Sequence, residues 1–132
     1  MQKHRSIAGL AEKNGQYFLA KRKPGGDLGG LWELPGGKLE AGESPSQAME
    51  REWMEELEIK VRTGSLLCTS TFSHNGKIFE LGLYKVLFEE QKMVLNEHDE
   101  TGWFKKAEVE KLDLAGSDRT ALALIWDEIT KK

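Results

Sequence analysis

The sequence predicts an α+β domain in which helices cover a mixed sheet. Segments with the patterns of strands come in two groups, and each group is followed by a helical segment. The chain has 132 residues, which is enough for one hydrophobic core, and it contains no internal repeat, low-complexity segment or linker. We therefore expect a single domain over residues 1–132.

Two strand-like segments near the N-terminus predict a β-hairpin. Residues 5–11 and 16–21 are rich in apolar side chains, and the Asn14-Gly15 step between them is typical of a tight hairpin turn. A Gly- and Lys-rich loop, KRKPGGDLGG, follows over residues 21–30. Arg22 in this loop is either solvated or in contact with an anionic ligand.

The next segment predicts a helix over residues 45–57. Its start carries three signals, which are Ser44 as N-cap, Pro45 at the first helical position and Gln47 as the last residue of an S-x-x-Q capping box. At about 100° per residue the helix has one apolar face and one acidic face. The apolar face consists of Met49, Trp53 and Leu57, and the acidic face of Glu52, Glu55 and Glu56.

The segments after this helix predict a second hairpin. Residues 61–72 and 78–88 are strand-like and flank an Asn75-Gly76 step. A charged connector then leads to Trp103 and Phe104, which predict a short strand.

A helical region is expected at the C-terminus. Residues 107–112 predict one or two helical turns, and Ser117 is the expected N-cap of a longer helix that extends to about residue 129. The expected apolar stripe of that helix consists of Ala121, Leu122, Leu124, Ile125 and Ile129.

Composition and charge exclude several classes of protein. The formal net charge is −3, so no basic field would recruit a polynucleotide or a membrane surface. Cys68 is the only cysteine, which excludes an intramolecular disulfide and gives no sign of an oxidising compartment. The N-terminal residues lack the long apolar core of a signal peptide, and no stretch reaches membrane-spanning length. We expect a cytoplasmic protein with neither a polynucleotide nor a membrane as partner.

The acidic face of the predicted helix needs a physical explanation. Like charges three and four residues apart destabilise a helix by about 0.2–0.5 kcal/mol per pair, so this face requires either full solvation or a bound cation. The helix alone leaves both interpretations open. Carboxylates without His or Cys partners favour the hard cations Mg²⁺ and Mn²⁺ over zinc. Upstream, Gly36 and Gly37 end an apolar segment at a place where glycine lets the backbone approach a ligand closely.

The charged residues around the helix form a longer motif. Gly37 is followed after five residues by Glu43, after seven more by Arg51-Glu52, and after two more by Glu55-Glu56. This pattern resembles the signature of the Nudix hydrolase family, and the YFLAKR, LWELPGGK and LAGSD segments extend the resemblance to its MutT-like branch. Glu58 stands where the family has glycine. This departure concerns the end of the helix, where glycine suits a left-handed C-cap.

The resemblance implies a Nudix-type α/β/α sandwich, with a mixed sheet between the motif helix and the C-terminal helix. It also implies a Mg²⁺ cofactor, with Mn²⁺ as a substitute, and hydrolysis of a nucleoside diphosphate linked to another group. The general base is either Glu52 or Glu97, and the number of metal ions stays open. The implied metal ligands are the Gly36 carbonyl and the side chains of Glu52, Glu55, Glu56 and Glu97.

Other residues have supporting roles by the same resemblance. Arg51 would hold the carboxylates through bidentate hydrogen bonds that a lysine does not reproduce, and Glu43 would steady Arg51 or the loop. Arg22 and Lys38 correspond to positions that contact substrate phosphates in MutT-like members. His98 is interpreted as a solvated or structural residue rather than a metal ligand.

Several features narrow the substrate within the family. The chain has no proline after Pro45 and no later tyrosine except Tyr84, and it lacks a coenzyme A motif, so the larger Nudix substrates are disfavoured. The LAGSD segment resembles pyrimidine-preferring members, in which Asp118 would accept a hydrogen bond from the exocyclic amine of cytosine. A protonated Asp118 would instead suit an oxidised purine, or the residue only supports the start of the helix. Leu34 and Phe72 would flank the base.

These implications define the expected function. It is the Mg²⁺-dependent hydrolysis of nucleoside triphosphates, with CTP, dCTP or modified pyrimidine deoxynucleotides preferred, to a nucleoside monophosphate and pyrophosphate. The alternatives are an 8-oxo-dGTP diphosphatase and a Nudix-fold sensor that binds a nucleotide without cleaving it. The complete set of Arg51 and three helix glutamates favours an enzyme over a sensor. Either a monomer or a homodimer is compatible with the sequence.

Overall fold

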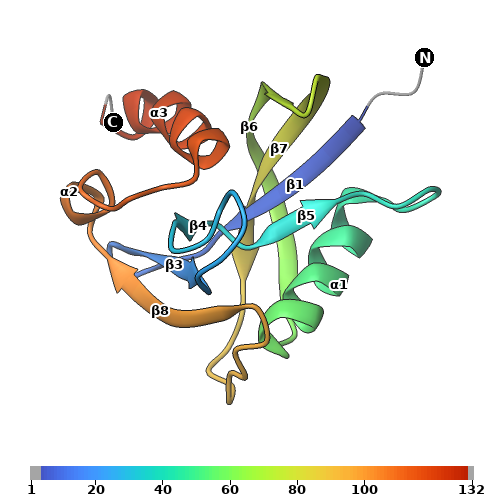
Figure 1. Cartoon of the computed structure of the whole chain (residues 1–132). Coiled ribbons are helices and arrows are strands. Elements are labelled where there is room, and N and C mark those ends of the chain that lie inside the picture. Colours follow the sequence, from blue (N-terminus) through green and yellow to red (C-terminus); the bar gives the residue numbers. More distant parts are fainter. Residues whose placement is uncertain (1–3, 131–132) are drawn as a thin grey trace.

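The structure is a computed structural model that describes the backbone of residues 4–130 and the side chains of residues 4–126 (Figure 1). None of the helices in this described part is long and apolar enough to cross a membrane. The elements are β1 (His4–Leu10), β2 (Glu12–Lys13), β3 (Gln16–Arg22), β4 (Trp32–Glu33), β5 (Gly36–Lys38), α1 (Pro45–Leu57), β6 (Arg62–His74), β7 (Lys77–Leu87), β8 (His98–Phe104), α2 (Lys106–Val109) and α3 (Gly116–Thr130).

The strands form two sheets. The first has the order β5-β1-β7-β6 and is mixed, because β1 and β7 run parallel while its other pairs are antiparallel. The second is antiparallel, with β3 paired to β2, β4 and β8. The predicted α+β class with a mixed sheet is confirmed, and the division into two sheets is an addition to it.

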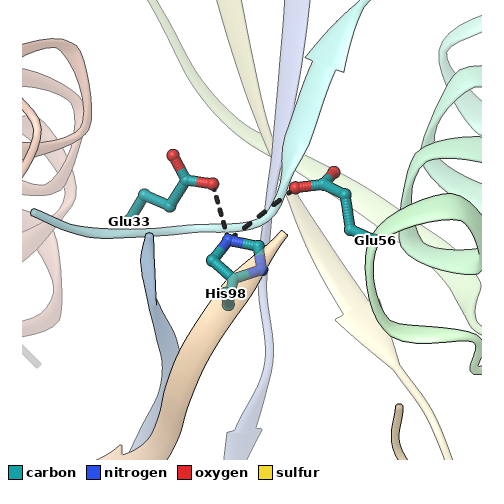
Figure 2. A group of neighbouring side chains, drawn as sticks. All are labelled: Glu33, Glu56 and His98. Atoms are coloured by element: carbon teal, nitrogen blue, oxygen red, sulfur yellow. Dashed lines mark hydrogen bonds and ion pairs between the residues drawn. The ribbon is translucent and has the colours of Figure 1, made fainter. Parts of the chain in front are cut away.

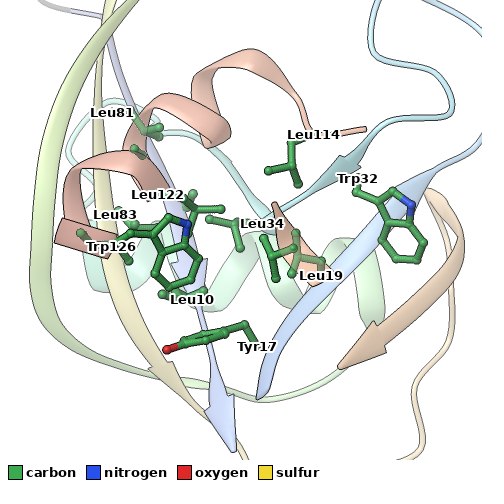
Figure 3. Close-up of a cluster of buried hydrophobic side chains, with 14 residues drawn as sticks. Leu10, Tyr17, Leu19, Trp32, Leu34, Leu81, Leu83, Leu114, Leu122 and Trp126 are labelled. Carbon is green, nitrogen blue, oxygen red and sulfur yellow. The ribbon is translucent and has the colours of Figure 1, made fainter. Parts of the chain in front are cut away.

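Two helices cover the first sheet from opposite sides (Figure 1). α1 packs against β1, β5 and β6, and α3 packs against β6 and β7. The side chains of β1 alternate between the two layers: Ile7 joins the apolar cluster around α1, whereas Ala8 and Leu10 join the cluster beneath α3. Figure 3 shows this second cluster, in which Leu122 of α3 and Leu34 lie in one apolar layer. The predicted sandwich is therefore confirmed.

Gly9 lies in β1 at the place where α1 packs on the sheet. A Cβ at this position would lie 2.5 Å from Cγ2 of Val86 and 3.0 Å from both Sδ of Met49 and Cζ2 of Trp53. These three side chains are buried and have no room to withdraw. We expect Gly9→Ala to lower the free energy of unfolding by about 1–3 kcal/mol, the range for overpacking a core, as measured by urea unfolding.

Gly116→Ala is the matched control for this change. A Cβ at Gly116 would meet nothing within 4 Å, and alanine favours the helix that begins there. The control is expected to be neutral or slightly stabilising. A Gly9→Ala protein as stable as the parent would contradict the packing described for α1.

The predicted N-terminal hairpin has the right turn but the wrong partner strand. Asn14 and Gly15 have φ values of 54° and 76°, as a tight turn requires, and they join β3 to the two-residue strand β2. β1 instead pairs with β5 and β7 in the other sheet. The turn is a local feature, whereas the change of sheet after β1 depends on distant strands. The second predicted hairpin, β6 and β7 around Asn75-Gly76, is confirmed.

Helix α1 has the predicted start and end. The Ser44 side chain accepts a hydrogen bond from the Gln47 N–H, and the Gln47 side chain accepts one from the Ser44 N–H. Glu58 ends the helix in the left-handed region, with φ 55°. Its carboxylate accepts a hydrogen bond from Asn96 Nδ2 at 3.0 Å, and the same amide donates to the Glu55 carbonyl at 2.8 Å. The residue in place of glycine thus connects the helix end to the segment before β8.

Two predicted boundaries in the C-terminal third are wrong. β8 begins at His98 and not near Trp103, because it pairs with most of β3. α3 begins at Gly116, and the N–H groups of its first turn donate to the Ala115 carbonyl, so Ser117 lies inside the helix and is not its N-cap. The short helix expected over residues 107–112 is the single turn α2.

The apolar stripe of α3 is narrower than predicted. Ala121, Leu122 and Ile125 are buried, whereas Leu124 is 49% exposed. The side chain of Ile129 lies outside the described residues. Only the face toward the sheet contributes to the core.

Candidate active site

A cleft of about 570 Å³ lies between β1, β5, the hairpin of β6 and β7, and the start of α3. Its walls combine apolar side chains with a few charged groups, as is usual for sites that bind small molecules. The cleft brings together all of the residues predicted to contact substrate, which are Arg22, Leu34, Lys38, Phe72 and Asp118.

Arg51 organises the acidic residues beside this cleft. Its Nε and Nη2 donate to the two carboxylate oxygens of Glu43 at 2.7 and 2.9 Å, and Nη1 donates to Glu52 Oε1 at 2.9 Å. Nη2 also donates to the Lys38 carbonyl at 3.0 Å. The bond from Arg51, aided by the Glu40 N–H, lowers the pKa of Glu43 to about 2. Glu43 therefore contacts both Arg51 and, through the Glu40 N–H, the loop before the helix.

The three helix glutamates occupy different environments. Glu56 is 2% exposed, whereas the side chains of Glu52 and Glu55 are 16% and 56% exposed. Burial raises the pKa of Glu56 to about 10, helped by the charges of Glu33, Glu52 and Glu97. Burial also raises the pKa of Glu52, and the bond from Arg51 opposes this effect. The predicted acidic face is therefore only partly solvated.

The buried carboxyl of Glu56 fits a cation ligand. Neither of its oxygens has a hydrogen-bond partner within the part of the chain that the structure describes. Gly37 of β5 lies against the neighbouring carboxylate, since a Cβ there would lie 2.6 Å from Cδ of Glu52. Gly36 lies beside Gly37 in β5, opposite Ala8 of β1. Oxygen donors of this kind suit a hard divalent cation, which would balance the charge that burial disfavours.

Glu97 lies across the site from α1. Its carboxylate is 51% exposed and lies 3.9 Å from Nη2 of Arg22. Its carbonyl accepts a hydrogen bond from the Lys23 N–H at 3.3 Å, which ties the Gly-rich loop to the start of β8. The charge of Glu97 contributes to the raised pKa of Glu56, so the two carboxyl groups interact electrostatically.

Asp118 forms the opposite, more apolar end of the cleft. The residue is 6% exposed, and its Oδ2 accepts a hydrogen bond from the Leu34 N–H at 3.0 Å. Burial raises the pKa of Asp118 to about 7, against the lowering effect of that hydrogen bond. Near neutral pH the side chain is therefore present in both protonation states.

Aromatic rings form one wall of the cleft. Phe72 and Phe79 stack with their centroids 5.1 Å apart and their planes 10° apart. The Lys38 ammonium lies 5.2 Å from the centroid of Phe79. Phe72 was a predicted site residue and Phe79 was not, although Phe79 lies opposite it across the β6–β7 ladder.

Two further polar residues of the site, Glu33 and His98, were not predicted as site residues. His98 is fully buried, and its Nε2 lies 2.9 Å from Glu33 Oε2 and 3.8 Å from Glu56 Oε1. Figure 2 shows the three side chains converging from β8, β4 and α1. The solvated interpretation of His98 is wrong. A usable signal for Glu33 was its place in the LWELPGG segment, next to glycines already assigned to the site.

The fold and this site define a class of protein. Residues 7–124 match the family model described as NUDIX domain. The chain therefore belongs to the Nudix family, and it is a Nudix hydrolase.

Individual relatives place it among MutT-like members of that family. The chain is 33% identical over 112 residues to a CTP pyrophosphohydrolase of Escherichia coli (strain K12), a match that covers 85% of this chain and 83% of that protein. It is 42% identical over 66 residues to an 8-oxo-dGTP diphosphatase of Proteus vulgaris, which covers 50% of this chain and 59% of that protein. The solution structure of the E. coli ORF135 protein superposes with a TM-score of 0.84 at 29% identity, covering 98% of this chain and 92% of that one.

Proposed function

We propose that this protein is a Mg²⁺-dependent nucleoside triphosphate pyrophosphohydrolase that prefers CTP, dCTP or modified pyrimidine deoxynucleotides. One observation carries the proposal: a single cleft has a buried hydrogen-bonding residue, Asp118, at one end and cationic residues beside a carboxylate cluster at the other. A nucleotide presents the same order of groups, from a polar base edge to a charged phosphate chain. The similarity to a CTP pyrophosphohydrolase supports the same assignment.

The metal would be held by Glu52, Glu55, Glu56, Glu97 and the Gly36 carbonyl. Once bound, Mg²⁺ supplies charge neutralisation at the phosphates and lowers the pKa of a water molecule. Arg51 keeps the Glu52 carboxylate in place, and Arg22 and Lys38 contact the phosphates. Water attacks the phosphate chain, and nucleoside monophosphate and pyrophosphate leave.

Two carboxylates are candidates for the general base that takes the proton from this water. Glu52 is held by Arg51 and largely buried, and burial raises its pKa, which makes its carboxylate a stronger base. Glu97 is more exposed and pairs loosely with Arg22. The pH dependence of kcat in Glu52→Gln and Glu97→Gln separates them, since only loss of the base removes the limb in which activity rises with pH.

The base would stack in the cleft with Leu34 and the Phe72 ring as its flanks. Ionised Asp118 accepts a hydrogen bond from the exocyclic amine of cytosine. Protonated Asp118 donates a hydrogen bond instead, and its pKa near 7 makes this form available. That observation favours a second candidate function, 8-oxo-dGTP hydrolysis, which also agrees with the Proteus vulgaris relative.

The test is steady-state release of pyrophosphate and phosphate with Mg²⁺ across a panel of substrates. The panel contains CTP, dCTP, methylated dCTP, 8-oxo-dGTP, the other NTPs, ADP-ribose and a diadenosine polyphosphate. Pyrophosphate released mainly from cytosine nucleotides supports the proposal, and preference for 8-oxo-dGTP supports the second candidate. Nucleotide binding without turnover would make the protein a sensor.

Asp118→Asn is the variant that tests base recognition on the same panel. Asparagine keeps the acceptor for the Leu34 N–H and adds an N–H donor, so we expect the ratio of kcat/KM between cytosine nucleotides and 8-oxo-dGTP to change by about tenfold or more. The kcat for the best substrate should change much less. Equal ratios in the variant and the parent would remove Asp118 from base recognition and leave it as a support for α3.

A further inference from the structure

The buried contact between His98 of β8 and Glu33 of β4 joins two strands that are far apart in sequence. His98 lies at the start of β8 with its side chain 0% exposed, and the Glu33 side chain is 10% exposed. Glu33 in turn accepts hydrogen bonds from Nη1 of Arg22, at 3.2 Å to Oε2 and 3.5 Å to Oε1. These contacts therefore link His98 through Glu33 to Arg22, from the interior of the protein to the phosphate end of the cleft.

The contacts of His98 assign its ring hydrogen to Nε2. Glu33 acts as an acceptor toward Arg22, so at the 2.9 Å contact the donor must be His98. Nδ1 is buried without a hydrogen-bond partner among the described residues. A bare lone pair at that position is less costly than a buried N–H with no acceptor.

This arrangement fits a hydrogen-bonded support better than a metal site. The ligand atoms of Glu33, Glu56 and His98 lie within 4.8 Å of one another, which raises the question of an ion between them. A metal on Nε2 would move the ring hydrogen to Nδ1, and metal-bound histidines normally donate this second N–H to an acceptor. The described residues offer no such acceptor to Nδ1 of His98. The guanidinium of Arg22, 3.2 Å from the same carboxylate, also opposes a cation there.

We infer that His98 is a positioning residue that holds the Glu33 carboxylate and, through it, orients the Arg22 guanidinium toward the phosphate chain. Nη1 of Arg22 is held by Glu33, while Nη2 lies on the side of Glu97. Without the Nε2–H donor, the Glu33 carboxylate is free to rotate. The Arg22 guanidinium then loses the hydrogen bonds that fix its orientation. This inference rests on the proposed function in one respect, the contact of Arg22 with phosphates.

The experiment measures the affinity for inorganic tripolyphosphate with Mg²⁺ by calorimetry, because this probe has phosphates but no base and its binding requires no nucleotide turnover. His98→Leu removes the donor, and His98→Gln keeps an N–H at about the reach of Nε2. We expect Kd to rise about tenfold in His98→Leu, equivalent to one well-placed charge-assisted hydrogen bond, and to stay within about threefold of the parent in His98→Gln.

The double variant supplies the critical comparison. In an Arg22→Met background, His98→Leu is expected to change Kd no further, because its effect passes through Arg22. An equal loss in both backgrounds, or a folded His98→Leu protein with parental Kd, would overturn the inference. Val109→Ala, a cavity at another fully buried position, is the control for lost packing and should lower Tm without changing Kd.

Three further outcomes are distinguishable. If His98→Leu does not fold, His98→Asn replaces it, because asparagine is polar but has no donor at the Nε2 position, and it should show the same loss. If the parent protein releases no pyrophosphate but His98→Leu still weakens tripolyphosphate binding, the proposed function fails and the positioning role of His98 stands. If tripolyphosphate binds the parent and Arg22→Met equally well, the positioning role fails.

Discussion

Glu56→Gln is expected to lower kcat by about two to four orders of magnitude, the scale of losing several kcal/mol of metal-assisted stabilisation of the transition state. Glutamine has the shape of the carboxyl but does not supply a charged oxygen to a cation. Because burial raises the pKa of Glu56 to about 10, the side chain is neutral at pH 7 when no cation is present. The variant should therefore fold, and at pH 7 it should be more stable than the metal-free parent, because glutamine does not ionise in the unfolded state as Glu56 does. Pyrophosphate release at saturating Mg²⁺ and urea unfolding measure the two effects.

Two neighbouring variants make this result interpretable. Glu50→Gln changes an exposed glutamate of the same helix outside the cluster and should leave kcat unchanged. Glu55→Gln, whose side chain is 56% exposed and 3.4 Å from Nη1 of Arg51, should also lower kcat by orders of magnitude. Near-normal turnover in both Glu55→Gln and Glu56→Gln would remove the metal assignment from this helix.

The sequence predicted those features that depend on neighbours along the chain. The start of α1 follows from Ser44, Pro45 and Gln47, and both Asn-Gly turns follow from the φ > 0 that these residues tolerate. The acidic cluster around Arg51 also follows, because the helix brings Glu52 and Glu55 to one side. These local signals predicted where the carboxylates cluster, whereas their role as metal ligands was predicted from the resemblance.

Features that depend on distant pairings were not predicted. His98 reaches Glu33 only because β8 and β4 both pair with β3, and no local pattern in the NEHDETGW segment indicates this. The burial of Glu56 is similar: the helix period places it on the acidic face, but the segment from Asn96 to His98 closes over it. The same closure gives the carboxyl its unusual pKa.

That pKa leads to an expected pH dependence of stability in the metal-free protein. The pKa of Glu56 is about 10 in the folded state and near 4.5 in the unfolded state, so between these values the folded state binds more protons and stability falls as pH rises. Glu52 acts in the same direction, and Asp118, with a pKa of about 7, has completed its contribution by about pH 8. Glu43, with a pKa of about 2, affects only acidic solutions. Above pH 8 Glu56 contributes to the remaining slope, and Tyr17, whose pKa is raised by burial, adds to it at more alkaline pH.

With EDTA present, we expect the free energy of unfolding to fall by on the order of 1 kcal/mol per pH unit between pH 8 and 9.5, as measured in urea. Glu56→Gln should flatten this slope, because glutamine does not titrate, whereas Glu50→Gln should retain it. Added Mg²⁺ should restore stability in the parent, and more so at higher pH, because the cation competes with the proton for Glu56. If Glu56→Gln has the same slope as the parent, protonation of the buried carboxyl is not coupled to folding. If the stabilisation by Mg²⁺ does not depend on pH, Glu56 is not a ligand of the cation.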